Sequence, residues 1–369
     1  MGHYRKQCIS FLVASECNLN CVYCYMPKWG ENIAPKDRVI DLEFAIAGLK
    51  DYLAWSPVPA IRFFAAGEAT HQFRRMVEIH DEARKLVGPA LRVELQTNGH
   101  FGEEVARWVE DNVNICWISA DGPPELHDAQ RPCLDGTGSS GIVLANIERL
   151  ARHPSMQFGV RATFMPGHFG RQIEVLEFFR ALGVRYVCGA PAYSSTVNPN
   201  ITVPVLQDFA HHFVPAYYHA QSVGMFYQTH LMVNFDEPVT CYCRACTKPA
   251  HPQLTSDGYV SCCDWASFGP DYLPGLLQAC IYGKWDPVAK RIEYFPEPEK
   301  LIEARNIETL GAGPCKGCPV LEHCAGGCIG KVAVRSGDLH KIDPNWCAAV
   351  KHLAKHIPFD TGVYPVRHS

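Results

Sequence analysis

The sequence predicts an α/β fold, in which a parallel sheet curls into a barrel or partial barrel and a smaller cysteine-rich domain follows. Short apolar runs alternate with helical patterns up to residue 227, as they do when helices connect parallel strands. After about residue 235, Pro, Gly and Cys become frequent and hydrophobic periodicity fades, which indicates a domain without a large apolar core. We expect a barrel domain in residues 1–234, a second domain in 235–350 and a tail in 351–369.

The expected elements of the first domain follow one another in a regular order. Strands are expected at residues 8–14, 60–65, 91–96, 114–119, 157–163 and 184–188, and helices at 42–54, 71–87, 102–111, 140–152, 169–182 and 203–223. In residues 42–54, apolar side chains recur every three or four positions, which predicts one buried helix face. Right-handed crossovers would curl such a sheet into a barrel, and barrels of this kind carry their working residues at the carboxyl ends of the strands. The strand count alone also permits an open sheet.

Composition excludes several classes of protein. The 369 residues are 47% hydrophobic and carry a net charge of −4, so we expect no nucleic-acid partner. No apolar run approaches the roughly 18–20 residues that a membrane span needs, and residues 1–14 make a poor signal peptide. We therefore expect a cytoplasmic protein without a membrane partner.

The eighteen cysteines are clustered. Three lie in the N-terminal loop, eleven lie between Cys241 and Cys347, and four lie elsewhere. In a cytoplasmic chain such clusters indicate metal binding. Of the four scattered cysteines, the three in strand-like runs, Cys8, Cys116 and Cys188, are expected to be buried and inert.

The N-terminal cluster is Cys17-x3-Cys21-x2-Cys24, on the loop after the first expected strand. Three thiolates on one loop hold three irons of a cubane cluster and leave the fourth iron open for chemistry. The alternative is a zinc knuckle, which needs a fourth ligand nearby. No Cys or His follows Cys24 before His71, which favours the cluster.

This spacing, with the aromatic Tyr23 before the last cysteine, resembles the signature of the radical S-adenosylmethionine (SAM) superfamily. The resemblance implies a (β/α)6 partial TIM barrel in which Cys17, Cys21 and Cys24 hold a [4Fe–4S] cluster. The open iron chelates SAM, and one electron from the cluster splits SAM into methionine and a 5′-deoxyadenosyl radical. That radical abstracts a hydrogen atom from the substrate.

Two strand ends offer predicted SAM contacts. The family usually has Gly-Gly-Glu-Pro after the second strand, and here Gly67 and Glu68 match whereas Ala66 and Ala69 depart from it. The resemblance implies that this turn meets the amino group of SAM; the alternative is a solvated turn. After the third strand, amides such as those of Gln96 and Asn98, with Thr97 between them, can bond ribose hydroxyls, although a plain Asn-Gly turn is the alternative.

The end of the fourth strand resembles a stretch of the anaerobic sulfatase maturases and related peptide-modifying enzymes. It reads Ser119-x-Asp121-Gly-Pro, followed by His127-Asp128 and Arg131. The resemblance implies that Ser119 and Arg131 bind the SAM carboxylate, which a guanidinium pairs with well. Arg161 on the fifth strand is a rival for this role. His127 is either a catalytic base or, with Asp128, a structural residue of the loop.

The C-terminal cysteines resemble the SPASM domain, which implies two auxiliary [4Fe–4S] clusters and three clusters in all. One is assigned Cys246, Cys263 and Cys328 with either Cys241 or Cys243, of which family spacing favours Cys241. The other is assigned Cys315, Cys318, Cys324 and Cys347. The alternative is two zinc sites. Asp264 follows Cys263, and an Asp at this position is the base of the sulfatase maturases; a structural or exposed carboxylate is the alternative.

We therefore expect a radical SAM/SPASM enzyme that crosslinks or oxidises a ribosomal peptide or a protein residue. Three rivals are sulfatase maturation from Cys or Ser to formylglycine, a radical reaction on a sugar or amino acid, and an electron carrier without turnover. The resemblance implies a flavodoxin or ferredoxin as electron donor. Because the first motif begins at residue 17, we expect any leader peptide to be bound by a separate protein or by the barrel mouth.

Overall fold

The computed structural model describes residues 8–24, 37–56, 58–64, 66–192, 205–232, 235, 252–273, 275–295, 305–338 and 340–359. Its framework is an eleven-stranded sheet with the order β11-β10-β9-β8-β1-β2-β3-β4-β5-β6-β7. Neighbours from β1 to β7 are parallel. The seven strands are β1 Ile9–Leu12, β2 Ala60–Phe64, β3 Arg92–Thr97, β4 Ile115–Ser119, β5 Gln157–Phe164, β6 Tyr186–Pro191 and β7 Phe226–Gln228.

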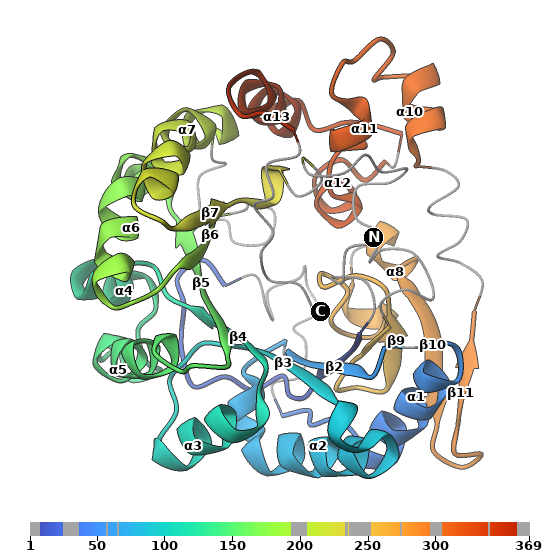
Figure 1. Ribbon diagram of the computed structural model, residues 1–369. Helices are drawn as coiled ribbons and strands as arrows, with labels where there is room; N and C mark the ends of the chain where they lie inside the picture. The colour runs from blue at the N-terminus through green and yellow to red at the C-terminus, as the bar shows by residue number, and fades with distance from the viewer. Residues whose placement is uncertain are drawn as a thin grey trace.

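Helices connect these strands and cover the outside of the sheet (Figure 1). They are α1 Leu42–Trp55, α2 Phe73–Val87, α3 Glu103–Asn112, α4 Pro124–Gln130, α5 Ser140–Ala151, α6 Gln172–Ala181 and α7 Leu206–Ser222. Asp41 caps α1 by accepting a 2.8 Å bond from the Phe44 amide, which satisfies one of the unpaired amides at a helix start. Every strand and helix expected in the first domain is confirmed to within a few residues. Helix α4 and strand β7 were not expected.

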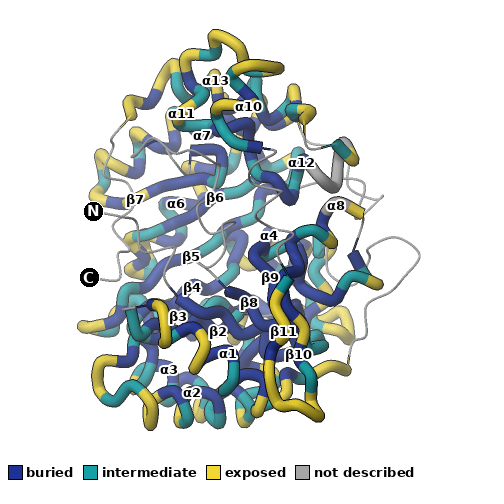
Figure 2. The backbone as a smooth tube through the Cα atoms, turned by 90° about the vertical axis from the view of Figure 1, so that its right-hand side faces the viewer, coloured by how far each residue is buried: buried dark blue, intermediate teal, exposed yellow. Residues whose placement is uncertain are grey.

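The sheet curves around a centre without closing, because β7 and β11 are its two ends. The expected partial barrel is therefore confirmed. Its strands are mostly buried, whereas exposed residues gather on the outer helices and on the β10–β11 turn (Figure 2). Cys8, Cys116 and Cys188 are buried in the sheet as expected.

The C-terminal region extends the same sheet. Its strands are β8 Gln253–Leu254, β9 Tyr259–Ser261, β10 Ile281–Asp286 and β11 Arg291–Tyr294, and its helices are α8 Gly275–Gln278, α10 Ile307–Ala312, α11 Leu321–Cys324, α12 Ile329–Ser336 and α13 Pro344–His356. Strand β8 pairs in parallel with β1, and β8 to β11 are antiparallel to one another. This places the residues after 252 directly beside the first strand of the barrel.

The expectation that this region lacks a substantial apolar core is wrong for its described residues. Leu254, Val260 and Trp346 belong to the same buried apolar cluster as Phe44 on α1. The ring of Trp285 on β10 lies 5.7 Å from that of Phe44. Periodicity fades in the sequence because strands of two to six residues leave too few alternations to detect.

Helix α13 crosses the boundary expected at residue 350. It packs beside α7, where the Asn345 side chain accepts a 2.8 Å bond from the Leu206 amide and Tyr218 donates one of 2.6 Å to the His356 carbonyl. Residues 351–356 are thus helical, and 360–369 lie outside the described residues. None of the helices in the described ranges is both long and apolar enough to cross a membrane.

Candidate active site

The loop that carries Cys17, Cys21 and Cys24 leaves the carboxyl end of β1 and is held by the end of α4 and the loop that follows it. The Asn20 amide donates a 2.8 Å bond to the Pro132 carbonyl. The Val22 amide donates one of 2.9 Å to the carbonyl of Gln130. The two loops therefore fix the cysteines at the carboxyl edge of the sheet, where barrel enzymes carry their active sites.

The structure brings these three thiols together. Burial, together with the nearby Glu68, Cys21 and Cys24, raises the pKa of Cys17 to about 12. Burial likewise raises the pKa of Cys21 to about 11, although Arg131 opposes the shift. Thiols crowded in this way become thiolates when a metal binds them. Such a group of cysteines fits an iron–sulfur cluster.

Gly67, which the sequence assigned to the SAM-binding turn, lies against the backbone of the cysteine loop. A Cβ atom at this position would come within 2.0 Å of the Glu16 carbonyl oxygen. The Gly67 amide donates to the Ala14 carbonyl at 3.0 Å, and the Glu68 amide donates to Glu16 at 2.8 Å. Only glycine permits this approach, so the turn after β2 supports the cysteine loop directly.

The carboxylate of Glu68 is buried and links the ends of β2 and β3. It accepts bonds from the amide and hydroxyl of Thr70 at 2.9 and 2.8 Å. It also accepts bonds from the Thr97 hydroxyl at 2.7 Å and the Asn98 amide at 2.6 Å. Glu68 therefore orients the two turns, and its predicted contact with SAM stays a prediction.

Gln96 and Asn98 point to different parts of the site. The Asn98 side chain donates to Asn18 in the cysteine loop at 2.7 Å, and its nitrogen lies 3.8 Å from the Cys17 sulfur. Gln96 instead bonds Glu94 at 3.1 Å and accepts a 2.6 Å bond from Arg161. The structure thus brings Asn98 to the cysteines and Gln96 to the inner face of the barrel.

Asp121, fully buried after β4, connects the predicted residues Tyr23 and Arg131. Its Oδ2 atom accepts bonds from the Tyr23 hydroxyl at 2.6 Å, Arg131 at 3.0 Å and Gln130 at 3.1 Å. Its Oδ1 atom accepts from the Thr163 amide at 2.9 Å. The guanidinium carbon of Arg131 lies 5.2 Å from the centre of the Tyr23 ring, and one guanidinium nitrogen is 4.0 Å from the Cys21 sulfur.

Asp121 is part of the motif after the fourth strand, but the motif alone did not predict a role for this residue. Burial alone lowers the pKa of Arg131, but Asp121, Tyr23 and Cys21 outweigh burial and leave that pKa above its ordinary value. Arg131 is therefore a permanent cation beside the cysteines, and Asp121 holds its guanidinium in place. Such a cation suits the predicted contact with a carboxylate.

The contacts of His127 are those expected of a structural residue of the loop. Its Nδ1 atom accepts a 3.4 Å bond from the Asp121 amide, and its Nε2 atom bonds the Ser139 hydroxyl at 3.0 Å. Burial, with Arg131 nearby, lowers the pKa of His127 to about 4. The adjacent Asp128 accepts bonds of 2.7 Å from both the amide and the hydroxyl of Ser140. Both residues tie α4 to the start of α5.

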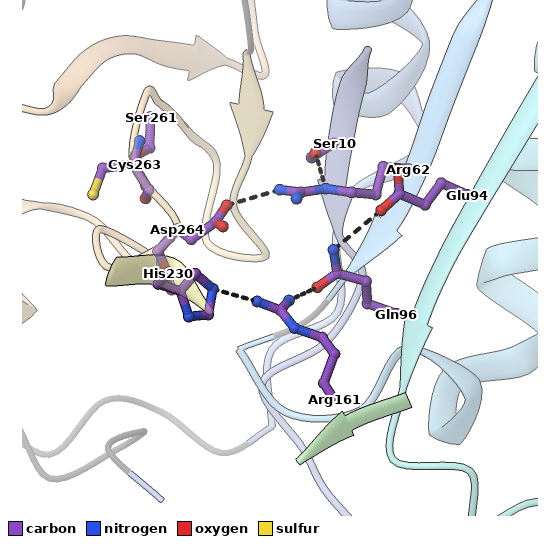
Figure 3. A network of polar contacts seen from close by, with 10 residues as sticks. Ser10, Arg62, Glu94, Gln96, Arg161, His230, Ser261, Cys263 and Asp264 are labelled. Atoms are coloured by element: carbon purple, nitrogen blue, oxygen red, sulfur yellow. Dashed lines mark hydrogen bonds and ion pairs between the residues drawn. The ribbon is translucent and has the colours of Figure 1, made fainter. Parts of the chain in front are cut away.

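Ser119 and Arg161 are register partners on β4 and β5. The Arg161 guanidinium donates to Gln96 at 2.6 Å, and its other terminal nitrogen lies 2.8 Å from the Nε2 atom of His230. Arg161 therefore belongs to the polar inner face (Figure 3), whereas Arg131 lies beside the cysteine loop. This placement favours Arg131 for the predicted SAM carboxylate contact.

Asp264 reaches the same inner face from the C-terminal region. Its Oδ1 atom lies 2.7 Å from a terminal nitrogen of Arg62, which projects from β2. Arg62 also donates a 2.7 Å bond from Nε to the Ser10 hydroxyl on β1. Figure 3 shows Asp264 facing Arg62, with Cys263 next to it in the chain. Sequence reasoning missed Arg62, because nothing in a strand residue announces a partner 202 positions away.

Four of the predicted auxiliary ligands surround one cavity. Cys315, Cys318, Cys324 and Cys347 all line one small cavity of about 20 Å³, together with the apolar Val320, Leu321, Ile342 and Trp346. Within the described residues, no three Cys, His, Asp or Glu side chains form a group that could hold a metal ion. Four cysteines around an apolar cavity fit the assigned iron–sulfur cluster.

The other auxiliary set is described only in part. Cys241, Cys243 and Cys246 lie outside the described residues, so the choice between Cys241 and Cys243 stays open. Cys263 is buried, and a Cβ on Gly330, two residues after Cys328, would come within 3.0 Å of its sulfur. The start of α12 therefore packs against Cys263, which agrees with a shared site for Cys263 and Cys328.

Arg305 is a second functional candidate that sequence reasoning missed. It is the largest fully buried side chain in the described ranges. Its guanidinium donates to the Lys341 carbonyl at 2.7 Å and to the Gly326 carbonyl at 2.5 Å. Burial lowers the pKa of Arg305, which the nearby thiols of Cys315 and Cys324 oppose. A buried cation here offsets negative charge on the predicted ligands.

A larger cavity of about 900 Å³ lies outside this site, between α1 and the β10–β11 hairpin. Its lining includes Tyr52, Trp55, Trp285 and Tyr294 but none of the predicted site residues. We therefore place the chemistry at the cysteine loop and the inner face of the barrel.

Comparisons with known proteins show what the chain resembles. Residues 12–182 match the family model of the radical SAM superfamily. The serine-type anaerobic sulfatase-maturating enzyme of Bacteroides thetaiotaomicron is 26% identical over 196 residues, which are 50% of this chain and 46% of that enzyme. The match thus spans about half the length of this curated relative.

Two solved structures share the fold. The structure of anSMEcpe with bound AdoMet and Cp18Cys peptide has a TM-score of 0.73 at 17% identity, covering 95% of this chain and 96% of that chain. Streptococcus suis SuiB bound to precursor peptide SuiA has a TM-score of 0.64 at 14% identity, covering 92% and 75%. The cysteine-rich C-terminal region fits a SPASM domain. The chain therefore carries a radical SAM domain in residues 12–182 and has, over nearly its whole length, the fold of anSMEcpe and SuiB.

Proposed function

We propose that this chain is a radical SAM/SPASM enzyme that removes two hydrogens from a residue of a peptide or protein, giving an oxidised or crosslinked side chain. The observation that carries the proposal is the position of Asp264. Its carboxylate follows Cys263, a predicted auxiliary ligand, and is anchored over the inner face of the barrel by Arg62. A proton acceptor is thereby placed between the predicted electron acceptor and the barrel that carries the three N-terminal thiols.

Cys17, Cys21 and Cys24 would hold the first cluster, which with SAM would supply the radical chemistry, and an auxiliary cluster would supply an acceptor for one electron. The residues of the chain supply binding and proton transfer. Asp121 orients Tyr23 and Arg131 beside Cys21, where Arg131 binds the SAM carboxylate. Asp264 takes the proton that leaves the substrate, alongside one hydrogen atom to 5′-deoxyadenosine and one electron to the auxiliary cluster. An electron donor of the flavodoxin or ferredoxin class starts each turnover.

A peptide substrate is supported by the two structural neighbours. One is anSMEcpe with a bound Cp18Cys peptide, and the other is SuiB with a precursor peptide. This chain shares their fold, and its own barrel interior is lined by Arg62, Gln96 and Arg161. We propose that a peptide segment enters this interior and that a separate protein or the barrel mouth binds any leader sequence.

Sulfatase maturation is the second candidate. The curated relative is a sulfatase-maturating enzyme, and the same Asp264 would deprotonate a Cys or Ser of the substrate. The turn after β2 departs from that family's pattern at Ala66. Ala66 is buried against Phe268, with the half-buried Cys24 and Tyr272 beside it. Its methyl group therefore makes an apolar contact at a position where the family usually has glycine.

A mass spectrum separates these candidates. Protein reconstituted anaerobically with iron and sulfide receives SAM, a reductant and either a sulfatase-type Cys peptide or the short peptides encoded beside the gene. Loss of sulfur with gain of oxygen on the first peptide supports sulfatase maturation. Loss of two hydrogens on another peptide supports the main proposal. If 5′-deoxyadenosine forms while every peptide stays unchanged, the peptide proposal is wrong and a small-molecule substrate replaces it.

Asp264→Asn tests the role of the carboxylate in the same assay. We expect product formation to fall about 100-fold, within the range of a lost general base, while uncoupled SAM cleavage continues. Asp135→Asn, in an exposed turn, is the matched control. Normal product formation by Asp264→Asn would remove this residue from the mechanism.

A further inference from the structure

We infer that Arg62 is a positioning residue that holds Asp264 at the inner face of the barrel and thereby couples SAM cleavage to product formation. The inference rests on the proposed role of Asp264. Arg62 on β2 and Asp264 in the C-terminal region form an ion pair of 2.7 Å. No sequence motif connects these two segments.

Arg62 is fixed within the sheet before it reaches Asp264. It is the register partner of Ser10 on β1 and of Glu94 on β3, so these three side chains share the inner face. Its Nε atom donates to the Ser10 hydroxyl at 2.7 Å, and its guanidinium carbon lies 5.1 Å from the centre of the Phe64 ring. The guanidinium therefore presents one terminal nitrogen to Asp264 in a set direction (Figure 3).

The charges make this contact more than a surface ion pair. The Arg62 side chain is only 9% exposed, whereas that of Asp264 is 43% exposed. Burial alone lowers the pKa of Arg62, but Asp264, Cys8 and Glu94 outweigh it and raise that pKa above its ordinary value. A buried, permanent cation holds a carboxylate more firmly than an exposed one does, because less water competes for the cation.

The loop that carries Asp264 is compact. The Cys263 amide donates to the Ser261 hydroxyl at 3.1 Å, the Ala266 amide donates to the Cys263 carbonyl at 2.9 Å, and the Ser267 hydroxyl donates to the Asp264 carbonyl at 2.7 Å. These bonds shape the loop from within but do not tie it to the barrel. Arg62 makes a direct side-chain tie from the barrel to Asp264, so its loss would let the carboxylate move.

The geometry also explains why an arginine is suited to this position. The planar guanidinium of Arg62 bonds Ser10 and Asp264 at once through two different nitrogens. The single ammonium group of a lysine reproduces this arrangement poorly. We therefore expect Arg62→Lys to retain part of the coupling and Arg62→Met, which has no charge, to lose it. Ser10→Ala, which removes only the first bond, should resemble Arg62→Lys.

The test is a double-mutant cycle between Arg62→Met and Asp264→Asn, read as product formed per 5′-deoxyadenosine released. In the wild-type background, Arg62→Met should lower this ratio about 10- to 100-fold, as expected when a reacting group is misplaced. In the Asp264→Asn background it should lower the ratio no further, because Arg62 then has no carboxylate to position. Independent, multiplying effects would overturn the inference. Arg152→Met, on the exposed end of α5, is the matched control and should change nothing.

A second measurement needs no substrate. Hydrogen exchange of the amides in residues 261–267 should become at least tenfold faster in Arg62→Met and stay unchanged in Arg152→Met, with the iron content of each variant determined in parallel. Unchanged exchange in Arg62→Met would refute the positioning role. If the wild-type protein modifies no peptide, the proposed function fails, whereas this measurement still decides whether Arg62 holds the loop.

Discussion

Tyr23 in the cysteine loop donates a 2.6 Å hydrogen bond to the buried carboxylate of Asp121, 98 residues later at the end of β4. The same oxygen accepts a 3.0 Å bond from Arg131, whose guanidinium lies over the Tyr23 ring. The aromatic residue of the cysteine motif and the predicted SAM-binding arginine are therefore one structural unit. Asp121 holds that unit together.

Asp121→Asn should destabilise the protein far more than Tyr23→Phe. The amide leaves Arg131 as a buried cation without its carboxylate, which costs about 3–5 kcal/mol of unfolding free energy. Removing the Tyr23 hydroxyl costs about 1 kcal/mol, as for an ordinary hydrogen bond. Anaerobic urea unfolding of the two variants measures the difference. Equal losses would show that Asp121 is not the centre of this network.

Gly67→Ala should displace the cysteine loop. Its Cβ would come within 2.0 Å of the Glu16 carbonyl oxygen, and backbone atoms cannot yield as the end of a flexible side chain does. We expect reconstituted protein to lose about four irons and to cleave SAM at least tenfold more slowly. Gly141→Ala, where a Cβ meets nothing within 4 Å, is the control. Full iron content and full SAM cleavage in Gly67→Ala would contradict the close packing of the two turns.

His127 should make stability depend on pH below neutrality. Its folded-state pKa is lowered from 6.5 to about 4, mainly by burial. The unfolded chain therefore binds more protons between these values, and stability falls as pH drops through this window. Wild-type protein should lose roughly 2 kcal/mol more between pH 7 and pH 5 than His127→Gln does. Equal pH dependence of the two unfolding free energies would show that His127 is not buried as a neutral ring.

Cys17→Ala should separate the first cluster from the auxiliary ones. Without one of three thiolates, the N-terminal loop should not retain its cluster, so SAM cleavage is expected to be lost while the C-terminal clusters remain. Iron analysis and quantification of 5′-deoxyadenosine check both parts. Cys116→Ala, at a buried strand position, should retain both iron and cleavage. Full 5′-deoxyadenosine formation by Cys17→Ala would refute the assignment of the loop.

The first domain was predictable because its signals are local. Helical periodicity in residues 42–54 and the apolar run at 60–65 each lie within a few positions, and both elements form as α1 and β2. The positions of Cys17 and Gly67 followed from their places at strand ends. The network at Asp121 was predictable only in part. Tyr23 and Arg131 were each predicted as site residues, but their shared contact with Asp121 forms only in the folded protein.

The remaining features depend on contacts that a single sequence does not reveal. Pairing of β8 with β1 and the bond from Arg62 to Asp264 each join segments about 200 residues or more apart. An arginine in a sequence is normally predicted to be exposed to solvent. The guanidinium of Arg305 is instead buried and bonds two backbone carbonyls. Short strands such as Gln253–Leu254 carry too little pattern to be recognised before the sheet that they extend is known.

The measurement that tests the central claim most directly is anaerobic cleavage of SAM by the reconstituted wild-type protein. With a low-potential reductant and iron bound, the protein should form 5′-deoxyadenosine and methionine in equal amounts, and this should stop when the reductant is omitted. A protein that carries its full iron and yet leaves SAM intact under these conditions would contradict the account. The three thiols of Cys17, Cys21 and Cys24 would then hold a metal centre that serves some purpose other than radical chemistry.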